Sequence, residues 1–122
     1  MEPITIAVDF DGTIVTHDYP YIGQPVPLAI ETIKDWIYKG GKVILWTMRH
    51  GEGLEEAVQY CKDAGIKFYG INENPSQHTW TDSQKAYAHY YVDDMAVGCP
   101  MMDYLEDRRV VDWAKVRELV GF

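Results

Sequence analysis

The stretch Ile4-Thr5-Ile6-Ala7-Val8-Asp9-Phe10-Asp11-Gly12-Thr13 decides the fold of this chain. Its first half is continuous, apolar and rich in β-branched residues, which predicts a strand buried on both faces. Side chains alternate along a strand, so Asp9 and Asp11 are expected to point into one crevice beyond its end. Two such carboxylates repel each other unless a cation lies between them or one is protonated. Gly12 permits a sharp turn and Thr13 adds a small donor, so the stretch favours a divalent cation and a phosphate.

Length and composition indicate one domain over residues 1–122. Hydrophobic residues make up 47% of the chain, which excludes a disordered acidic protein. The formal net charge of −8 argues against a nucleic-acid binder that depends on a basic surface. We expect neither a signal peptide nor a membrane span, because there is no basic-then-apolar leader and no apolar run of about 18 residues. With only Cys61 and Cys99, a cytoplasmic protein with reduced thiols is the simplest interpretation.

Strand-like and helix-like segments alternate along the chain. We expect strands at 4–8, 42–46, 66–71, 90–92 and 110–111, and helices at 28–39, 54–64 and 113–120. This alternation predicts an α/β fold, a Rossmann-like three-layer sandwich with a mainly parallel sheet and helices on both faces. Asp112 is expected to cap the last helix. Trp36, Trp46 and Trp113 lie on apolar faces or strands and are expected in the core.

Polar residues follow three of these strands at the point where each strand ends. Asp9 and Asp11 follow the first strand, Thr47 follows the second, and Asp93-Asp94 follows the fourth. Ligands bind beyond the carboxyl ends of parallel strands, so these side chains are expected to converge on an active site. Such a set suits hydrolysis of a phosphate monoester. One Asp attacks phosphorus to form an aspartyl-phosphate, and a second carboxyl group donates and later accepts a proton.

The order of these residues resembles the four motifs of the haloacid dehalogenase-like (HAD) superfamily, over roughly residues 4–97. The resemblance implies that Asp9 is the nucleophile and a Mg²⁺ ligand. It implies that Asp11 is the general acid/base, with its backbone carbonyl also on the metal. Thr47 would bind the phosphoryl group, and Asp93 and Asp94 would complete the metal site. Asp rather than Thr at position 11 is similar to the phosphatases of the family and unlike its ion-pumping ATPases.

Three further residues are candidates for contacts with the phosphate, namely Gly12, Arg49 and Lys85. Lys85 lies eight residues before the late acidic pair, which is similar to small members of the family. Its rivals for this role are Lys62 and Lys67. Arg49 follows the second strand closely and carries a fork of donors, although a charge on a surface loop is an equal alternative.

The chain has no room for a cap domain. About 15 residues separate the first motif from the first helix, and the loop over residues 72–82 is shorter still. A capless site is either open to a large substrate or covered by a second copy of the chain. Candidate specificity residues lie on the two loops, namely His17, Tyr19, Tyr21, Asn72, Asn74, His78 and Trp80.

The sequence therefore predicts a Mg²⁺-dependent phosphatase for a small phosphorylated metabolite, nucleotide or sugar phosphate. One alternative is a non-catalytic protein that holds a phosphorylated ligand in the same pocket, and another is phosphoryl transfer to an acceptor other than water. A signalling receiver domain fits poorly, because it needs a lone phospho-acceptor Asp after a middle strand, whereas Thr47 follows the second strand here.

Overall fold

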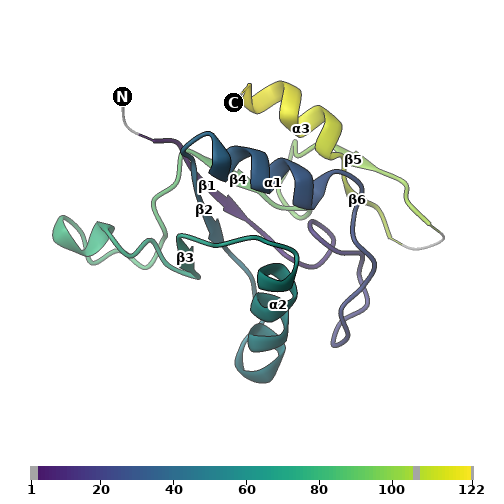
Figure 1. The fold of residues 1–122 in the computed structure, drawn as a ribbon, viewed down its shortest axis with the longest axis horizontal. Coiled ribbons are helices and arrows are strands. Elements are labelled where there is room, and N and C mark those ends of the chain that lie inside the picture. Colours follow the sequence, from purple (N-terminus) through teal and green to yellow (C-terminus); the bar gives the residue numbers. More distant parts are fainter. Residues whose placement is uncertain (1–2, 106–107, 122) are drawn as a thin grey trace.

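The computed structural model describes residues 3–105 and 108–121 and is built around a four-stranded sheet. All its strand pairs are parallel, in the order β3-β2-β1-β4 (Figure 1). The strands are β1 (Thr5–Val8), β2 (Lys42–Leu45), β3 (Gly70–Ile71) and β4 (Tyr90–Val92), and the helices are α1 (Ala29–Tyr38), α2 (Gly51–Asp63) and α3 (Trp113–Val120). Two short strands, β5 (Met101–Met102) and β6 (Val110–Val111), pair antiparallel outside this sheet. The predicted α/β fold with a mainly parallel sheet is confirmed.

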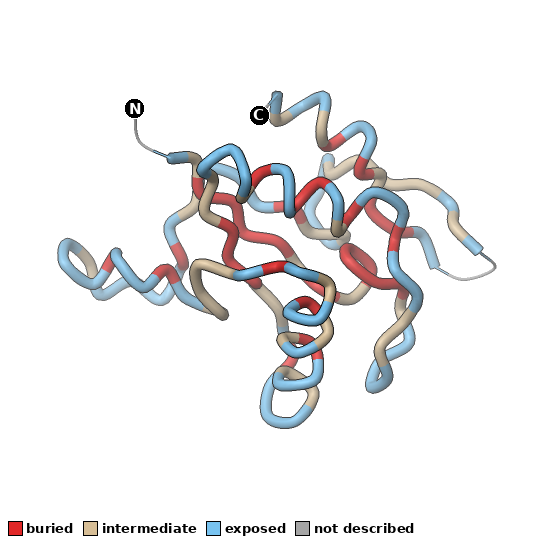
Figure 2. The backbone as a smooth tube through the Cα atoms, in the orientation of Figure 1, coloured by how far each residue is buried: buried red, intermediate tan, exposed pale blue. Residues whose placement is uncertain are grey.

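The main hydrophobic core lies between one face of the sheet and the helices. Alternate strand residues such as Ile6, Val8 and Leu45 join one buried cluster with apolar residues from all three helices. Figure 2 shows these strands as the buried centre of the molecule. Trp36 of α1 and Trp113 of α3 are buried as predicted, and their ring centroids lie 5.7 Å apart. This aromatic contact helps to hold α3 beside α1.

The opposite face of the sheet is covered without a regular helix. The segment over residues 72–89, which links β3 to β4, contains only the short 3₁₀ helix η1 (Gln77–Thr79), and part of it extends outward beyond β3 (Figure 1). The Thr5 N–H donates to His89 Nδ1 at 3.0 Å, and the Tyr91 hydroxyl donates to the Ala86 carbonyl. The expectation of helices on both faces is thus met on one face only. The segment has no apolar repeat of helical period, so its order comes from individual hydrogen bonds.

Other elements begin or end at residues that differ from those predicted from the sequence. The predicted strand 66–71 is reduced to β3, and α2 begins three residues before the predicted helix. Residues 110–111 do form a strand, but they pair with β5 rather than with the parallel sheet. The Asp112 carboxylate accepts from the Lys115 N–H at 3.2 Å, so the predicted cap of α3 is confirmed.

Cys61 and Cys99 are both free thiols. Burial raises the pKa of Cys61 to about 12, so this side chain is a neutral part of the core. No helix within residues 3–105 and 108–121 is long and apolar enough to cross a bilayer. The loop between β1 and α1 contains a flap, residues 16–27, whose base is closed by the bridge between Val15 and Pro25.

Candidate functional site

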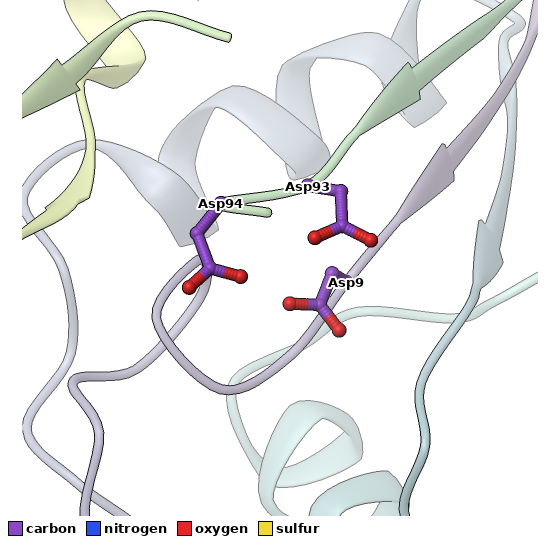
Figure 3. A group of neighbouring side chains, drawn as sticks. All are labelled: Asp9, Asp93 and Asp94. Atoms are coloured by element: carbon purple, nitrogen blue, oxygen red, sulfur yellow. The ribbon is translucent and has the colours of Figure 1, made fainter. Parts of the chain in front are cut away.

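Three carboxyl groups meet beyond the carboxyl ends of β1 and β4 (Figure 3). Val8 and Val92 are partners in the parallel ladder, so the next residues along each strand, Asp9 and Asp93, leave the sheet side by side. Oxygen atoms of Asp9, Asp93 and Asp94 all lie within 4.8 Å of one another. The sheet therefore brings together carboxylates that are more than 80 residues apart in the sequence.

The three carboxyl groups repel one another when they are ionised. Burial, and next the negative charge of Asp93, raise the pKa of Asp9 to about 8. Burial also raises the pKa of Asp93, and the neighbouring Asp94 adds to the effect. Three converging oxygen ligands with this much mutual repulsion suit a hard divalent cation, and Mg²⁺ prefers oxygen ligands of this kind. The donor set therefore fits the expected magnesium.

The metal-free protein is expected to lose stability as the pH rises from about 4 to about 8. In this interval the folded protein holds a proton on Asp9 that the unfolded chain has released, because the folded pKa is about 8 and the ordinary value is 3.8. The free energy of unfolding should fall by up to about 1.4 kcal/mol per pH unit. Urea unfolding at several pH values, with and without MgCl₂, measures this slope. Mg²⁺ should stabilise the protein most at the alkaline end, and a flat metal-free profile would contradict the repulsion.

Thr13 and His17 hold the carboxylates from the side of the loop after β1. The fully buried Thr13 hydroxyl donates to Asp9 Oδ2 at 3.2 Å and accepts from the Asp94 N–H at 3.3 Å. His17 Nε2 lies 2.8 Å from Asp94 Oδ2. The sequence identified Thr13 only as a donor and His17 only as a flap residue. The contact with Asp94 had no sequence signal, because 77 residues separate it from His17.

Gly12 allows the flap to approach the late acidic pair. Its φ is +81°, and its N–H donates to the Val15 carbonyl at 2.7 Å, so the predicted contact between Gly12 and phosphate gives way to a tight turn. A Cβ atom here would overlap His17 Nε2 and the Asp94 carboxylate. Only a residue without a side chain fits between this turn and the side chains of His17 and Asp94.

Gly12→Ala is therefore expected to destabilise the protein by about 2 kcal/mol or more and to weaken Mg²⁺ binding, since it combines backbone strain with a steric clash. Gly40→Ala is the matched control. Gly40 has a φ of +96° but no atoms near the added Cβ, so only the strain of about 1 kcal/mol applies. Thermal unfolding and Mg²⁺ titration of both variants make the comparison, and equal effects would show that the clash is unimportant.

Asp11 lies apart from the three-carboxylate group. Its two carboxylate oxygens accept from Nε and Nη2 of Arg49, each at 2.8 Å. The structure therefore places the side chain of Asp11 in an ion pair, whereas the sequence predicted it beside Asp9. The alternation rule fails here because β1 ends at Val8, and the chain turns at Gly12 before a second alternation is complete.

Arg49 is buried and fully engaged, which corrects its predicted role as a phosphate ligand. The residue is 3% exposed, and its guanidinium also donates to the carbonyls of Pro20, Tyr21 and Gly53 at 3.3, 2.8 and 3.3 Å. Its central carbon lies 5.1 Å from the ring centroids of Phe10 and of Tyr19. The hydrogen bonds to Asp11 raise the pKa of Arg49 further. The side chain anchors the flap to the loop that follows β2.

A cleft of about 340 Å³ opens beside the carboxylates. Its lining residues are Asp9, Trp46, Thr47, Met48, Asn72 and Asp93. The Thr47 hydroxyl oxygen accepts from the Arg49 N–H, which leaves the hydroxyl proton to donate into the cleft. Asn72 accepts from the Thr47 N–H at 2.7 Å and fixes this loop. Thr47, which the sequence predicted at the site, and Asn72, a candidate specificity residue, thus both line the cleft with Asp9.

Trp46 was expected in the core and instead lines the cleft, half-buried. The partner of Leu45 in the ladder is Val8, so Trp46 follows β2 as Asp9 follows β1. The Trp46 N–H continues this pairing by donating to the Val8 carbonyl at 2.8 Å. The alternation of side chains then puts the indole on the same face as Asp9, a signal that the sequence contained.

None of the three candidate lysines lines the cleft. Lys85 Nζ lies 5.4 Å from the ring centroid of Tyr91, and no ion pair joins it to a carboxylate within the described part of the chain. Lys62 and Lys67 line a different groove, between α2 and β3. Of the other loop candidates, Asn74, His78 and Trp80 lie on the segment over residues 72–89 and line cavities away from Asp9.

A solved structure is similar to this chain over nearly its whole length. No protein-family model matches the chain, and neither does any curated protein. A solved structure described as "Structure of the conserved protein coded by locus from Bacteroides thetaiotaomicron" matches with a TM-score of 0.81 and 39% sequence identity. The match covers 98% of this chain and 91% of that chain. The chain therefore belongs to the same family as this conserved protein from Bacteroides thetaiotaomicron.

Proposed function

We propose that this protein is a Mg²⁺-dependent phosphatase that hydrolyses a phosphate monoester through an aspartyl-phosphate on Asp9. The observation that carries the proposal is the group formed by Asp9, Asp93 and Asp94, whose oxygens lie within 4.8 Å of one another beside an open cleft. The resemblance of the sequence motifs to the HAD superfamily points to the same chemistry.

Four residues of the candidate site have roles in this proposal. The Asp9 carboxylate attacks phosphorus, and the bond from phosphorus to the leaving oxygen breaks. Water then attacks the aspartyl-phosphate and regenerates Asp9. The Thr47 hydroxyl donates to a phosphoryl oxygen. Asp9, Asp93 and Asp94 would hold Mg²⁺, which supplies positive charge for the phosphoryl oxygens.

A second candidate function is a protein that binds a phosphorylated ligand without turnover. One observation favours it, because both oxygens of Asp11 are held by Arg49 and neither belongs to the three-carboxylate group. A binding protein has no need of an acid/base in the cleft. Asp9 nevertheless remains beside Asp93 and faces the cleft, as a nucleophile requires.

The decisive experiment is phosphate release from a panel of phosphate monoesters, including aryl phosphates, nucleotides, sugar phosphates and alkyl phosphates. Each is assayed with MgCl₂ and with EDTA, for the wild type and for Asp9→Asn. We expect turnover that needs Mg²⁺ and disappears in the variant. Mg²⁺-dependent ligand binding without any phosphate release would instead support the binding protein.

A further inference from the structure

We propose that the cleft selects phosphate monoesters with an aromatic, uncharged leaving group, and that Trp46 and Met48 are the residues that select it. This inference rests on the proposed phosphatase function and deepens it by naming the substrate class. Three observations support it. The cleft has an apolar wall, its six lining residues include no cationic side chain, and Asp11 is bonded to Arg49.

The apolar wall begins next to the proposed nucleophile. Trp46 and Asp9 are neighbours across the extended ladder of β1 and β2, and both line the cleft. Met48 follows two residues later, lines the same cleft and is 95% exposed. An indole and a flexible thioether both interact favourably with aromatic rings. A phosphoryl group at Asp9 therefore leaves its substituent within reach of an aromatic and apolar surface.

The six residues that line the cleft offer no cationic side chain to a second negative charge. They include two aspartates and no Lys, Arg or His. The nearby guanidinium of Arg49 is buried and already bonded to Asp11 and three carbonyls. A diphosphate or a carboxylated substrate would place its extra charge in an unfavourable environment. The phosphoryl group should therefore be the substrate's only anion in the cleft.

The position of Asp11 favours a leaving group that needs no donated proton. Both of its oxygens accept hydrogen bonds from Arg49, and Asp11 is not among the residues that line the cleft. A phenol such as that of tyrosine ionises near a pKa of about 10, far below the pKa of an alkyl alcohol, whose hydroxyl resembles that of water. An aryl oxygen is thus a far better leaving group than an alkyl oxygen when no acid assists.

The reaction needs no reactant besides the phosphate ester and water. An Asp9 oxygen forms a bond to phosphorus, and the aryl oxygen departs with the electron pair of its own bond to phosphorus. Water then attacks phosphorus, the bond to Asp9 breaks, and inorganic phosphate is released. The first step leaves a phenolate, which takes a proton from solvent, and the second step returns a proton from the attacking water to solvent.

Binding of phosphonates to the wild-type protein tests the inference separately from catalysis, because their carbon–phosphorus bond is not cleaved. Calorimetry in MgCl₂ compares phenylphosphonate, methylphosphonate and 4-carboxyphenylphosphonate. We expect phenylphosphonate to bind about 10-fold more tightly than methylphosphonate. The carboxylated compound should lose most of that advantage. Trp46→Ala should abolish the preference, and Met48→Ala should reduce it about 3-fold.

Two further points control for effects of the substitutions on folding and for the loss of an aromatic side chain elsewhere. Met48 is so exposed that its truncation should leave folding unchanged, and Tyr38→Ala on α1 removes an aromatic side chain, 92% exposed, that does not line the cleft. Equal binding of phenylphosphonate and methylphosphonate would overturn the inference and leave the phosphatase proposal standing. A phenyl preference that survives in both cleft variants would overturn the assignment of Trp46 and Met48. Failure of every phosphonate to bind would overturn the inference and the proposed function together.

Discussion

Asp9→Asn is expected to lower phosphatase turnover by roughly 10³-fold or more while making the metal-free protein more stable at alkaline pH. Turnover falls because an amide cannot attack phosphorus as a carboxylate does. Stability rises because the variant removes the group whose pKa is raised to about 8 by burial and by Asp93. Above that pH the wild type must hold a buried negative charge beside two other carboxylates, and the variant need not.

Two measurements separate these effects. Phosphate release gives the change in turnover, and urea unfolding from pH 4 to pH 9 in EDTA gives the change in stability. The stability curves of variant and wild type should converge near pH 4, where Asp9 is protonated in the wild type. Asp82→Asn, on the exposed surface of the segment over residues 72–89, is the matched control and should change neither quantity. A variant that retains turnover would remove Asp9 from its proposed role.

Arg49→Met is expected to lower the free energy of unfolding by about 3–5 kcal/mol, since it removes a buried guanidinium and leaves the partly buried carboxylate of Asp11 without its partner. The loss includes two hydrogen bonds to Asp11 and three to backbone carbonyls. The flap should also become susceptible to proteolysis, because Arg49 connects Pro20 and Tyr21 to the loop after β2. Arg49→Lys keeps the charge but lacks the planar fork, so a loss of about 2 kcal/mol is expected.

Arg109→Met provides the comparison on an exposed ion pair. Arg109 lies 3.6 Å from Asp103, and both side chains are largely exposed, so a change within about 0.5 kcal/mol is expected. Urea unfolding and limited proteolysis measure these effects. If Arg49→Lys kept full stability and only raised the KM for a phosphate ester, the residue would bind substrate and the flap-anchor role would be wrong.

Much of the fold follows from local patterns in the sequence. The apolar run before Asp9 forms β1, the helical spacing after the flap forms α1, and Asp112 caps α3. These elements are decided within a few residues of the chain, where strand and helix periodicity dominate. Residues 66–69 and the segment over residues 72–89 were harder to predict, because their conformation depends on pairing and hydrogen bonds with distant segments.

The candidate site could be predicted only in part, because it also depends on contacts between segments that are distant in the sequence. Asp9 and Asp93 could be placed together because parallel strands end at one edge of a sheet. The ion pair between Asp11 and Arg49 joins residues 38 apart in the sequence, and its geometry depends on the turn at Gly12. The sequence indicated that Arg49 carries a fork of donors, and the tertiary structure determined which acceptors surround it.

The sequence by itself determined the strand that ends at Asp9, the acidic pair at positions 93 and 94, and the parallel sheet that brings them to one edge. These features depend on side-chain type and on periodicity, which local sequence specifies. Only the tertiary structure decided that Arg49 binds Asp11 and the flap, and that Trp46 borders the cleft. Such contacts depend on the direction and burial of side chains after the chain has folded, because a donor bonds to whichever acceptors packing brings within its reach.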